Sequence, residues 1–385
     1  MKISKMVSNI QPSLTRKLFD MAKNYEDVID FTLGDPDYET PDYIKQAGCE
    51  AIMGGKTKYS ANAGLEELRK VVSERIEKET GVYYNPATEI QITVGAMEGI
   101  YLSLCCLIDP GDEVIIPSPY WVNYKHMTEM LAGVPVLVDT DEEHEFIATP
   151  EDILNAVSEK TKVIIINSPN NPTGAVYDRW TLQEISRIAI EKDIMVIFDE
   201  CYKSILFDNA QFTSILDFYG MKEHAIIVNS CSKRFSMTGW RIGYLAGPAE
   251  LITHFPKLQE NIAACAPLPS QYAAIAALSR EDNEVNEMRM GYEKRRNLLV
   301  KGINEIDMLS CKYPKGTFYA MVNIKKTGMN SEQFAYALLK EVQVAVVPGS
   351  TYGEASEGYV RMAYTMNEEK IIQGLERIKK FIDSL

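Results

Sequence analysis

The sequence predicts an α/β fold: a mainly parallel, doubly wound sheet wrapped by helices, with a second, smaller domain. Two observations lead to this prediction. Apolar runs of strand length recur between residues 90 and 229, and segments with helical spacing lie between several of them. Alternating strands and helices are typical of a parallel sheet with helices on its faces. From about residue 286 the pattern changes, which indicates the second domain.

Six continuous apolar runs are the predicted strands of the large sheet. They are residues 90–94, 113–117, 134–138, 162–167, 194–199 and 225–229. Continuous runs, rather than alternating ones, are typical of strands that are buried on both faces. Between two of these strands, residues 181–192 carry apolar side chains at helical spacing and are predicted to form a helix.

The C-terminal part begins with a long charged helix, continues with short strands and closes with another helix. In the closing helix the apolar residues from Ile371 to Ile382 keep helical spacing, and Asn367 is the predicted N-cap. We predict a large domain of residues 46–285 and a small domain formed by residues 1–45 and 286–385.

The composition of the chain argues against several classes of binding partner and site. A net charge of -14 argues against nucleic acid and against anionic membranes, because both attract clustered Lys and Arg. No apolar run approaches the ~18 residues of a membrane-spanning helix, and the first ten residues lack the apolar core of a signal peptide. Seven cysteines without a C-x-x-C pair suggest reduced thiols and a cytoplasmic protein. The four scattered histidines predict neither a metal site nor a histidine-based triad.

Five polar, turn-forming segments follow directly after predicted strands. They are G-A-M-E-G (95–99), P-S-P-Y-W (117–121), N-S-P-N-N-P-T-G (167–174), D-E-C-Y (199–202) and N-S-C-S-K (229–233). In an open parallel sheet, ligands bind at the carboxyl ends of the strands. The sequence therefore predicts a binding site at this edge, with Lys233 within it.

One interpretation of Lys233 is serine-based acyl transfer. Residues Ser230 to Lys233 satisfy S-x-x-K, and Lys326 to Gly328 satisfy K-T-G, as in serine β-lactamases. However, the S-x-N at residues 60–62 precedes the serine, whereas it follows the serine in those enzymes. Their S-x-x-K also opens a helix, whereas here it follows a predicted strand. These differences argue against acyl transfer.

A second interpretation makes Lys233 a lysine that binds an aldehyde covalently. Such an amine must be neutral to attack, and neighbouring cations, here Arg234 and Arg241, favour the neutral form. Arg241 and the Ser230 hydroxyl could also bind the phosphate of a phosphorylated aldehyde. Taken alone, S-x-S-K is equally compatible with a lysine that stands at a strand end by coincidence.

The wider sequence favours the second interpretation. S-C-S-K-R-F-S-M-T-G-W-R-I-G-Y (230–244) resembles the pyridoxal-phosphate lysine segment of class I and II aminotransferases, the aspartate aminotransferase family. The likeness covers nearly the whole chain. It includes F-T-L-G-D-P-D-Y (31–38), K-Y-S-A-N-A-G (58–64), V-P-G-S-T-Y-G (347–353) and Y-V-R-M-A-Y (359–364). The resemblance implies a fold-type-I enzyme with a seven-stranded sheet and a small α+β domain built from both termini.

The resemblance also implies a cofactor, pyridoxal 5'-phosphate, and roles for individual residues. Lys233 would bind the cofactor covalently and then act as general base and acid. Asp199 would hold the ring nitrogen protonated, and Tyr202 and Asn171 would donate hydrogen bonds to the phenolic oxygen. Each residue type is also common at strand ends in turns or cores, so these assignments depend on the surrounding motifs.

The remaining cofactor contacts implied by the family concern the ring face and the phosphate. Trp121 would stack on the ring. Ala96 and Met97 would donate main-chain hydrogen bonds to the phosphate, from a helix expected to begin at about residue 97. Ser230 and Arg241 would bind the same phosphate. Tyr59 would reach it from the other subunit of a homodimer.

For the substrate, the resemblance implies that Arg361 binds the α-carboxylate, helped by Gly34 and Asn171. Relatives of this subgroup that accept dicarboxylic amino acids carry a lysine where this chain has Met97. We therefore expect a neutral, apolar or aromatic amino donor, a 2-oxo acid acceptor and ping-pong order. Glu98, if it faced the pocket, would repel a second carboxylate.

Two alternatives remain open. A C–S β-lyase of the same fold would share the early steps. A non-enzymatic, ligand-sensing regulator is disfavoured, since only about 30 residues precede F-T-L-G and no basic recognition helix is visible.

Overall fold

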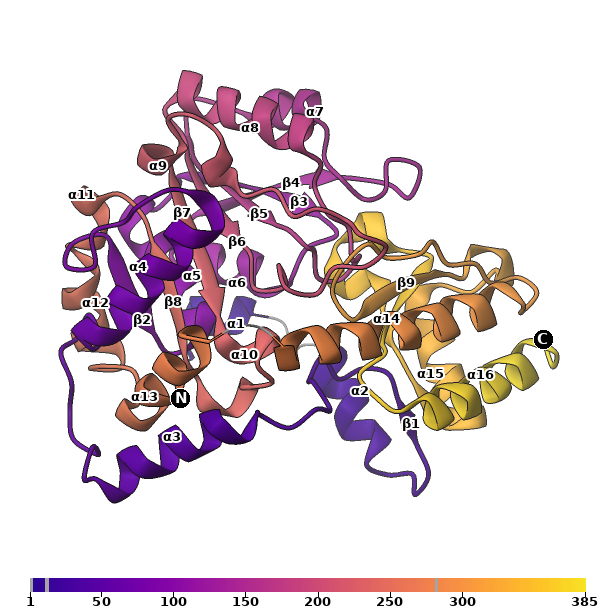
Figure 1. Ribbon diagram of the computed structural model, residues 1–385. Helices are drawn as coiled ribbons and strands as arrows, with labels where there is room; N and C mark the ends of the chain where they lie inside the picture. The colour runs from indigo at the N-terminus through magenta and orange to yellow at the C-terminus, as the bar shows by residue number, and fades with distance from the viewer. Residues whose placement is uncertain (1–2, 11–13, 281–282) are drawn as a thin grey trace.

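A seven-stranded sheet forms the centre of the structure, a computed structural model that describes residues 3–10, 14–280 and 283–385 (Figure 1). Residues 1–2, 11–13 and 281–282, which fall within the predicted domains, lie outside the described residues. The strand order is β2-β8-β7-β6-β5-β3-β4. Only β8 runs antiparallel to its neighbours. The prediction of an α/β fold with a mainly parallel, seven-stranded sheet is confirmed.

The strands of this sheet agree closely with the predicted runs. Their bounds are β2 (Ile90–Thr93), β3 (Glu113–Ser118), β4 (Val134–Asp139), β5 (Thr161–Asn167), β6 (Met195–Asp199), β7 (Ala225–Ser230) and β8 (Gly243–Ala246). Strand β8 was not among the six predicted runs. It has only four residues and is stabilised by pairing with β2 and β7, which its own sequence does not reveal.

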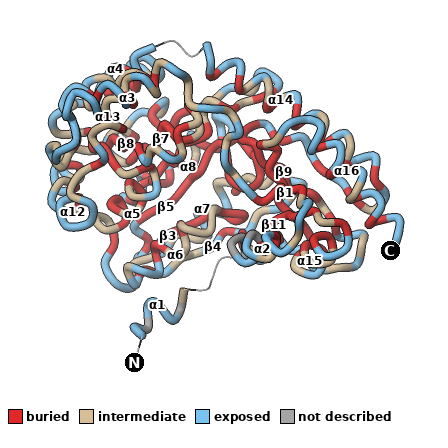
Figure 2. Tube along the Cα trace, turned by 90° about the horizontal axis from the view of Figure 1, so that it is seen from below, coloured by how far each residue is buried: buried red, intermediate tan, exposed pale blue. Residues whose placement is uncertain are grey.

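Both faces of the sheet are buried, which explains why its strands are continuously apolar. In β5, Ile164 and Ile166 belong to one apolar cluster and Val163 and Ile165 to another, because successive side chains point to opposite faces. Helix α8 covers the first face and helix α5 the second. Figure 2 shows the buried residues concentrated along these strands, with exposed helical turns around them.

The helices before α14 are α1 (Lys5–Asn9), α2 (Leu14–Ala22), α3 (Asp42–Met53), α4 (Glu66–Thr80), α5 (Gly95–Leu107), α6 (Asn123–Met130), α7 (Pro150–Ala156), α8 (Arg179–Lys192), α9 (Met221–His224), α10 (Cys231–Arg234), α11 (Ala249–Ile252), α12 (Phe255–Ile262) and α13 (Leu268–Leu278). They do not all lie on the large sheet, because α2 packs beside residues 344–348 of the C-terminal part. Helix α8 contains the predicted segment 181–192, which confirms that prediction. Among the described residues, none of the helices combines the length and the apolar character that a membrane span requires.

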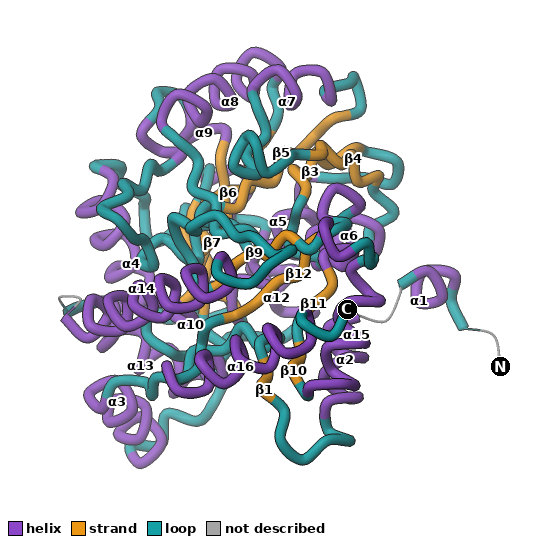
Figure 3. Tube along the Cα trace, turned by 90° about the vertical axis from the view of Figure 1, so that its right-hand side faces the viewer, coloured by secondary structure: helices purple, strands orange, loops and turns teal. Residues whose placement is uncertain are grey.

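A smaller sheet lies in the C-terminal part. Strands β11 (Val347–Pro348), β12 (Tyr359–Ala363) and β9 (Tyr319–Asn323) form it in that order, all antiparallel. Helices α14 (Asn283–Asn304), α15 (Ser331–Val342) and α16 (Glu368–Ile382) accompany it (Figure 3). The predicted closing helix is α16, and the Asn367 side chain accepts the amide N–H of Lys370, which confirms the predicted cap.

The N-terminal segment joins this C-terminal part. Strand β1 (Ile29–Asp30) pairs in parallel with β10 (Val344–Ala345), and the amide of Ala363 donates to the carbonyl of Phe31. The predicted domain edges at 45/46 and 285/286 fall inside α3 and α14. The division into two domains with these edges stays a prediction.

Candidate active site

A cavity of about 510 Å³ lies at the carboxyl edge of the large sheet, where β2, β5, β6 and β7 end. Every predicted site residue except Tyr59 lines it. These residues are Gly34, Ala96, Met97, Trp121, Asn171, Asp199, Tyr202, Ser230, Lys233, Arg241 and Arg361. The N-terminal segment, the large sheet and the small sheet thus all contribute to one cavity.

Lys233 lies in the single helical turn α10, directly after β7. Its Nζ donates a hydrogen bond to the carbonyl oxygen of Gly34 at 2.7 Å and lies 5.5 Å from the centroid of the Phe318 ring. A Cβ on residue 34 would lie 1.8 Å from the Tyr319 hydroxyl. Tyr319 can therefore approach residue 34 this closely only because that residue is glycine. The amine therefore projects into the cavity from the sheet toward the N-terminal segment.

The S-x-x-K segment lies at the junction between β7 and this helical turn. Ser230 ends β7 and also precedes the helical turn, so its S-x-x-K both follows a strand and opens a helix. The expectation that it would not open a helix is wrong, because one strand-to-helix junction satisfies both descriptions. Neither Lys326 nor Ser60, from the other two acyl-transfer signatures, lines the cavity.

Asp199 is the last residue of β6 and is 5% exposed. Its Oδ2 accepts a hydrogen bond from the Tyr124 hydroxyl at 2.6 Å, and its Oδ1 accepts the Cys201 amide at 3.0 Å. Burial raises the pKa of Asp199 above its usual value, and these two hydrogen bonds only partly oppose the shift. Within the part of the chain that the structure describes, no cationic side chain forms an ion pair with this carboxylate. A cationic group of a ligand would therefore be stabilised beside it.

Tyr202 lies in the turn after β6, beyond Cys201, and it is buried. Its hydroxyl is 3.1 Å from the Tyr319 hydroxyl, and its ring packs edge-on against Phe318. Burial raises the pKa of Tyr202 well above its usual value, and Tyr319 adds to the shift. The phenol consequently stays protonated near neutral pH and can donate a hydrogen bond.

An anion cradle lies at the junction of β2 and α5. Helix α5 begins at Gly95, two residues earlier than expected, which places the Ala96 and Met97 amides in its first turn. Gly95 has φ +74, and a Cβ there would lie 2.6 Å from Nη2 of Arg241. The Arg241 guanidinium therefore lies directly against Gly95. Free helix N–H groups beside an arginine and the Ser230 hydroxyl suit a phosphate.

Arg361 projects from β12 and is 5% exposed. Its Nη1 donates to Oδ1 of Asn171 at 3.2 Å, and its Nη2 donates to the Thr32 carbonyl at 2.6 Å. Its Nε is buried without a hydrogen-bond partner among the described residues. A buried guanidinium with neutral partners and one spare donor is suited to a carboxylate of a ligand.

The other predicted residues differ in their placement. Trp121 packs edge-on against Tyr124, with ring centroids 5.3 Å apart, and Met97 is 41% exposed at the cavity. Glu98 points back to its own helix, since its Oε2 accepts the Val94 amide at 2.5 Å, and it does not line the cavity. Tyr59 is 87% exposed on the surface of the chain.

Sequence reasoning missed four residues that complete the site. Tyr124, Thr32, Asn167 and Tyr319 all line the cavity. Tyr124 could have been found, because it follows Trp121 by three residues, just beyond a segment already assigned to the strand ends. Thr32 lies in the motif F-T-L-G-D-P-D-Y but was given no role, and Tyr319 carries no local signal. Both are in contact at the site with residues far away in the sequence.

Comparison with known proteins identifies the family. The family model for aminotransferase class I and II matches residues 26–378. The chain is 41% identical to aromatic-amino-acid aminotransferase 2 of Thermococcus litoralis, over 99% of this chain and 98% of that protein. It is also 41% identical to the aspartate aminotransferase of Pyrococcus abyssi, with the same coverage. A solved structure of the Thermus thermophilus aspartate aminotransferase with maleate superposes with a TM-score of 0.94, at 35% identity, over 99% of this chain and 100% of that one. The chain therefore belongs to the aminotransferase class I and II family and is an aminotransferase.

Proposed function

We propose that this aminotransferase binds pyridoxal 5'-phosphate in the cavity and transfers the amino group of a neutral or aromatic L-amino acid to a 2-oxo acid. One observation carries the proposal. A single cavity holds an amine, a buried carboxylate that forms no ion pair with the described residues, and a buried guanidinium with only neutral partners: Lys233, Asp199 and Arg361.

The donor set fits this cofactor. The Asp199 carboxylate would pair with a protonated ring nitrogen, and the anion cradle of Gly95, Ala96, Met97 and Arg241 would hold the phosphate. Trp121 offers an aromatic face at the cavity wall. When bound, pyridoxal 5'-phosphate supplies an aldehyde that takes up the amino group and a ring that delocalises the electrons released at the substrate α-carbon.

The side chains of the protein then orient the substrate and move its proton. Arg361 binds the α-carboxylate through its spare Nε and a terminal nitrogen, which fixes the direction of the Cα–H bond. The free Lys233 Nζ would accept the α-proton and give it up later in the same half-reaction. Tyr202 and Asn171, which line the cavity, would donate hydrogen bonds to the phenolic oxygen of the cofactor. Because amino donor and 2-oxo acid use the same Arg361, they occupy the cavity in turn, as ping-pong order requires.

The lining of the cavity supports a neutral donor. Besides Lys233, Arg241 and Arg361, which have the roles above, no lysine or arginine lines it among the described residues. Met97 and Leu33, both partly exposed at the cavity, would offer an apolar surface to the substrate side chain. A second substrate carboxylate would stay unpaired there, which costs several kcal/mol. A cation from the other subunit of a dimer would remove this penalty.

Two measurements test the proposal. Borohydride reduction of the cofactor-loaded protein, followed by peptide mapping, should place the label on Lys233; a label on another lysine would refute the assignment. In a donor screen with 2-oxoglutarate, kcat/KM should be higher for leucine, methionine and phenylalanine than for aspartate. A clear preference for aspartate would overturn the predicted donor class, and pyruvate released from cystathionine would instead favour the β-lyase.

A further inference from the structure

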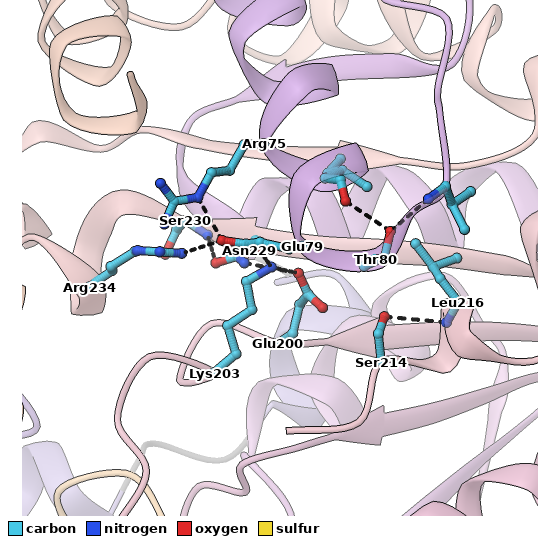
Figure 4. A network of polar contacts seen from close by, with 12 residues as sticks. Arg75, Glu79, Thr80, Glu200, Lys203, Ser214, Leu216, Asn229, Ser230 and Arg234 are labelled. Atoms are coloured by element: carbon cyan, nitrogen blue, oxygen red, sulfur yellow. Dashed lines mark hydrogen bonds and ion pairs between the residues drawn. The ribbon is translucent and has the colours of Figure 1, made fainter. Parts of the chain in front are cut away.

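A network of ion pairs lies behind the strand ends, outside the cavity, and converges on Glu79 near the end of helix α4 (Figure 4). Oε1 of Glu79 lies 2.6 Å from Nε of Arg75 and 3.1 Å from Nη1 of Arg234. Its Oε2 lies 2.8 Å from Nζ of Lys203. One carboxylate thus contacts three cations from α4, from the loop after β6 and from the turn after β7.

A second carboxylate extends the network to β7. Glu200 is 1% exposed, and its Oε1 pairs with Nζ of Lys203 and accepts a hydrogen bond from Nδ2 of Asn229 at 3.1 Å. The Oδ1 of Asn229 in turn accepts the Ser230 amide at 2.7 Å. Lys203 is therefore held between the two carboxylates, Glu200 and Glu79 (Figure 4).

The network residues alternate along the chain with residues that line the cavity. The adjacent pairs are Asp199 and Glu200, Tyr202 and Lys203, Ser230 and Asn229, and Lys233 and Arg234. In each pair one side chain faces the cavity and its neighbour enters the network. Any movement of the network would consequently move the backbone that carries the cavity residues.

We propose that Glu79 is a positioning residue for the transamination reaction: it ties the β6 loop to the β7 turn and so fixes Tyr202 relative to Lys233. This inference rests on the proposed function, in which both side chains act on the bound cofactor. Glu79 itself does not line the cavity.

The charges of the network support a role of Glu79 in positioning the cavity residues. The Lys203 and Arg234 side chains are 9% and 10% exposed, so each needs a carboxylate nearby, and Glu79 serves both. Burial disfavours the ionised form of Glu79, but Lys203 and Arg75 outweigh it and lower its pKa. Buried ion pairs add little net stability compared with apolar packing, and in some proteins they fix one arrangement of their partners. A misplacement of about 1 Å can reduce the rate of a reaction about 10²-fold.

The test is Glu79→Gln in the cofactor-loaded enzyme, with Glu77→Gln as the matched control on the exposed side of the same helix. We expect kcat of Glu79→Gln to fall by about 10- to 100-fold, while KM for the amino donor stays within about twofold. The visible circular dichroism per bound cofactor should also fall, because it depends on how the site orients the chromophore. Glu77→Gln should match the parent in all three measurements.

A second variant keeps the proposal testable if Glu79→Gln misfolds. Arg234→Gln removes the other partner of the Glu79–Arg234 contact. Like Glu79→Gln, it should lower kcat and the visible circular dichroism. If both residues act through this contact, the double variant should lose no more kcat than the worse single variant. Multiplied losses would overturn the shared role.

The remaining outcomes are also decisive. If Glu79→Gln lowers only the free energy of unfolding, with kcat and visible circular dichroism unchanged, Glu79 is structural and the inference is wrong. If the parent enzyme is active and labelled at Lys233 but Glu79→Gln equals Glu77→Gln, the inference alone fails. If the parent is not labelled at Lys233, the proposed function fails and this inference fails with it.

Discussion

Two charged side chains of the cavity, Asp199 and Arg361, are buried with neutral hydrogen-bond partners. Asp199 is held by a phenol and an amide, and Arg361 by an amide oxygen and a carbonyl. Burying a charge without a counter-charge is unfavourable for folding, so such groups persist where a ligand provides the partner. The same two residues, Asp199 and Arg361, therefore carry both the unfavourable charges and the proposed binding function.

Asp199→Asn tests the first of these charges. In the cofactor-loaded enzyme we expect kcat to fall about 10²- to 10³-fold, because a neutral amide no longer stabilises a protonated ring nitrogen. A variant that turns over at the parent rate would refute the role of Asp199.

The cofactor-free protein gives an independent measurement on the same variant. Since burial raises the pKa of Asp199 above 3.8, the folded state binds more protons than the unfolded state between 3.8 and the raised pKa. The parent therefore loses stability as the pH rises through this window. Relative to the parent, the free energy of unfolding of Asp199→Asn should increase between pH 4 and pH 7. A pH-independent difference would contradict this prediction.

Arg361→Lys tests the second charge while keeping its sign. Lysine cannot present two parallel donors to a carboxylate, so we expect kcat/KM for the amino donor to fall about 10²-fold, mostly through KM. Steady-state kinetics measure this directly. Arg187→Lys is the control, because Arg187 pairs with Glu184 and Glu191 on the exposed face of α8. Equal kinetics for the two variants would exclude Arg361 from carboxylate binding.

At the scale of elements, the junction between β2 and α5 shows why glycine is required in the cradle. Gly95→Ala would strain a residue with φ +74 and push a Cβ to 2.6 Å from Arg241. Gly81→Ala is a matched control, since Gly81 has φ +75 but nothing within 4 Å of its Cβ position. Both variants should lose about 1–2 kcal/mol of unfolding free energy. Only Gly95→Ala should bind the cofactor more weakly, by about tenfold, as measured by fluorescence titration; equal affinities would refute the cradle.

Much of the arrangement of these elements could be predicted from the sequence. Six strands of the large sheet and the polar segments after them are local patterns, so the sequence alone places Asp199 and Lys233 at one edge of the sheet. Strand β8 could not be predicted, because its four residues are ordered by their neighbours. Tyr319 and Thr32 reach the cavity through contacts between residues more than a hundred positions apart, which a local pattern does not encode.

At the scale of the whole molecule, Tyr59 is the residue through which we predict a second subunit. The side chain is 87% exposed and does not line the cavity of its own chain. We expect a homodimer in which Tyr59 contacts the cofactor phosphate of the neighbouring subunit. Light scattering should give twice the 43.4 kDa chain mass, and Tyr59→Phe should weaken cofactor binding about tenfold. A fully active monomer would contradict this prediction.

The bond between Arg361 and the Thr32 carbonyl joins residues 329 positions apart. During synthesis on the ribosome, every strand of the large sheet has been made once residue 246 has been added, and Asp199 and Lys233 are then both present. The partner of Thr32 is made more than a hundred residues later. A nascent chain could therefore assemble the proposed cofactor site well before the proposed substrate clamp, so that recognition of the amino acid is the last property the protein acquires.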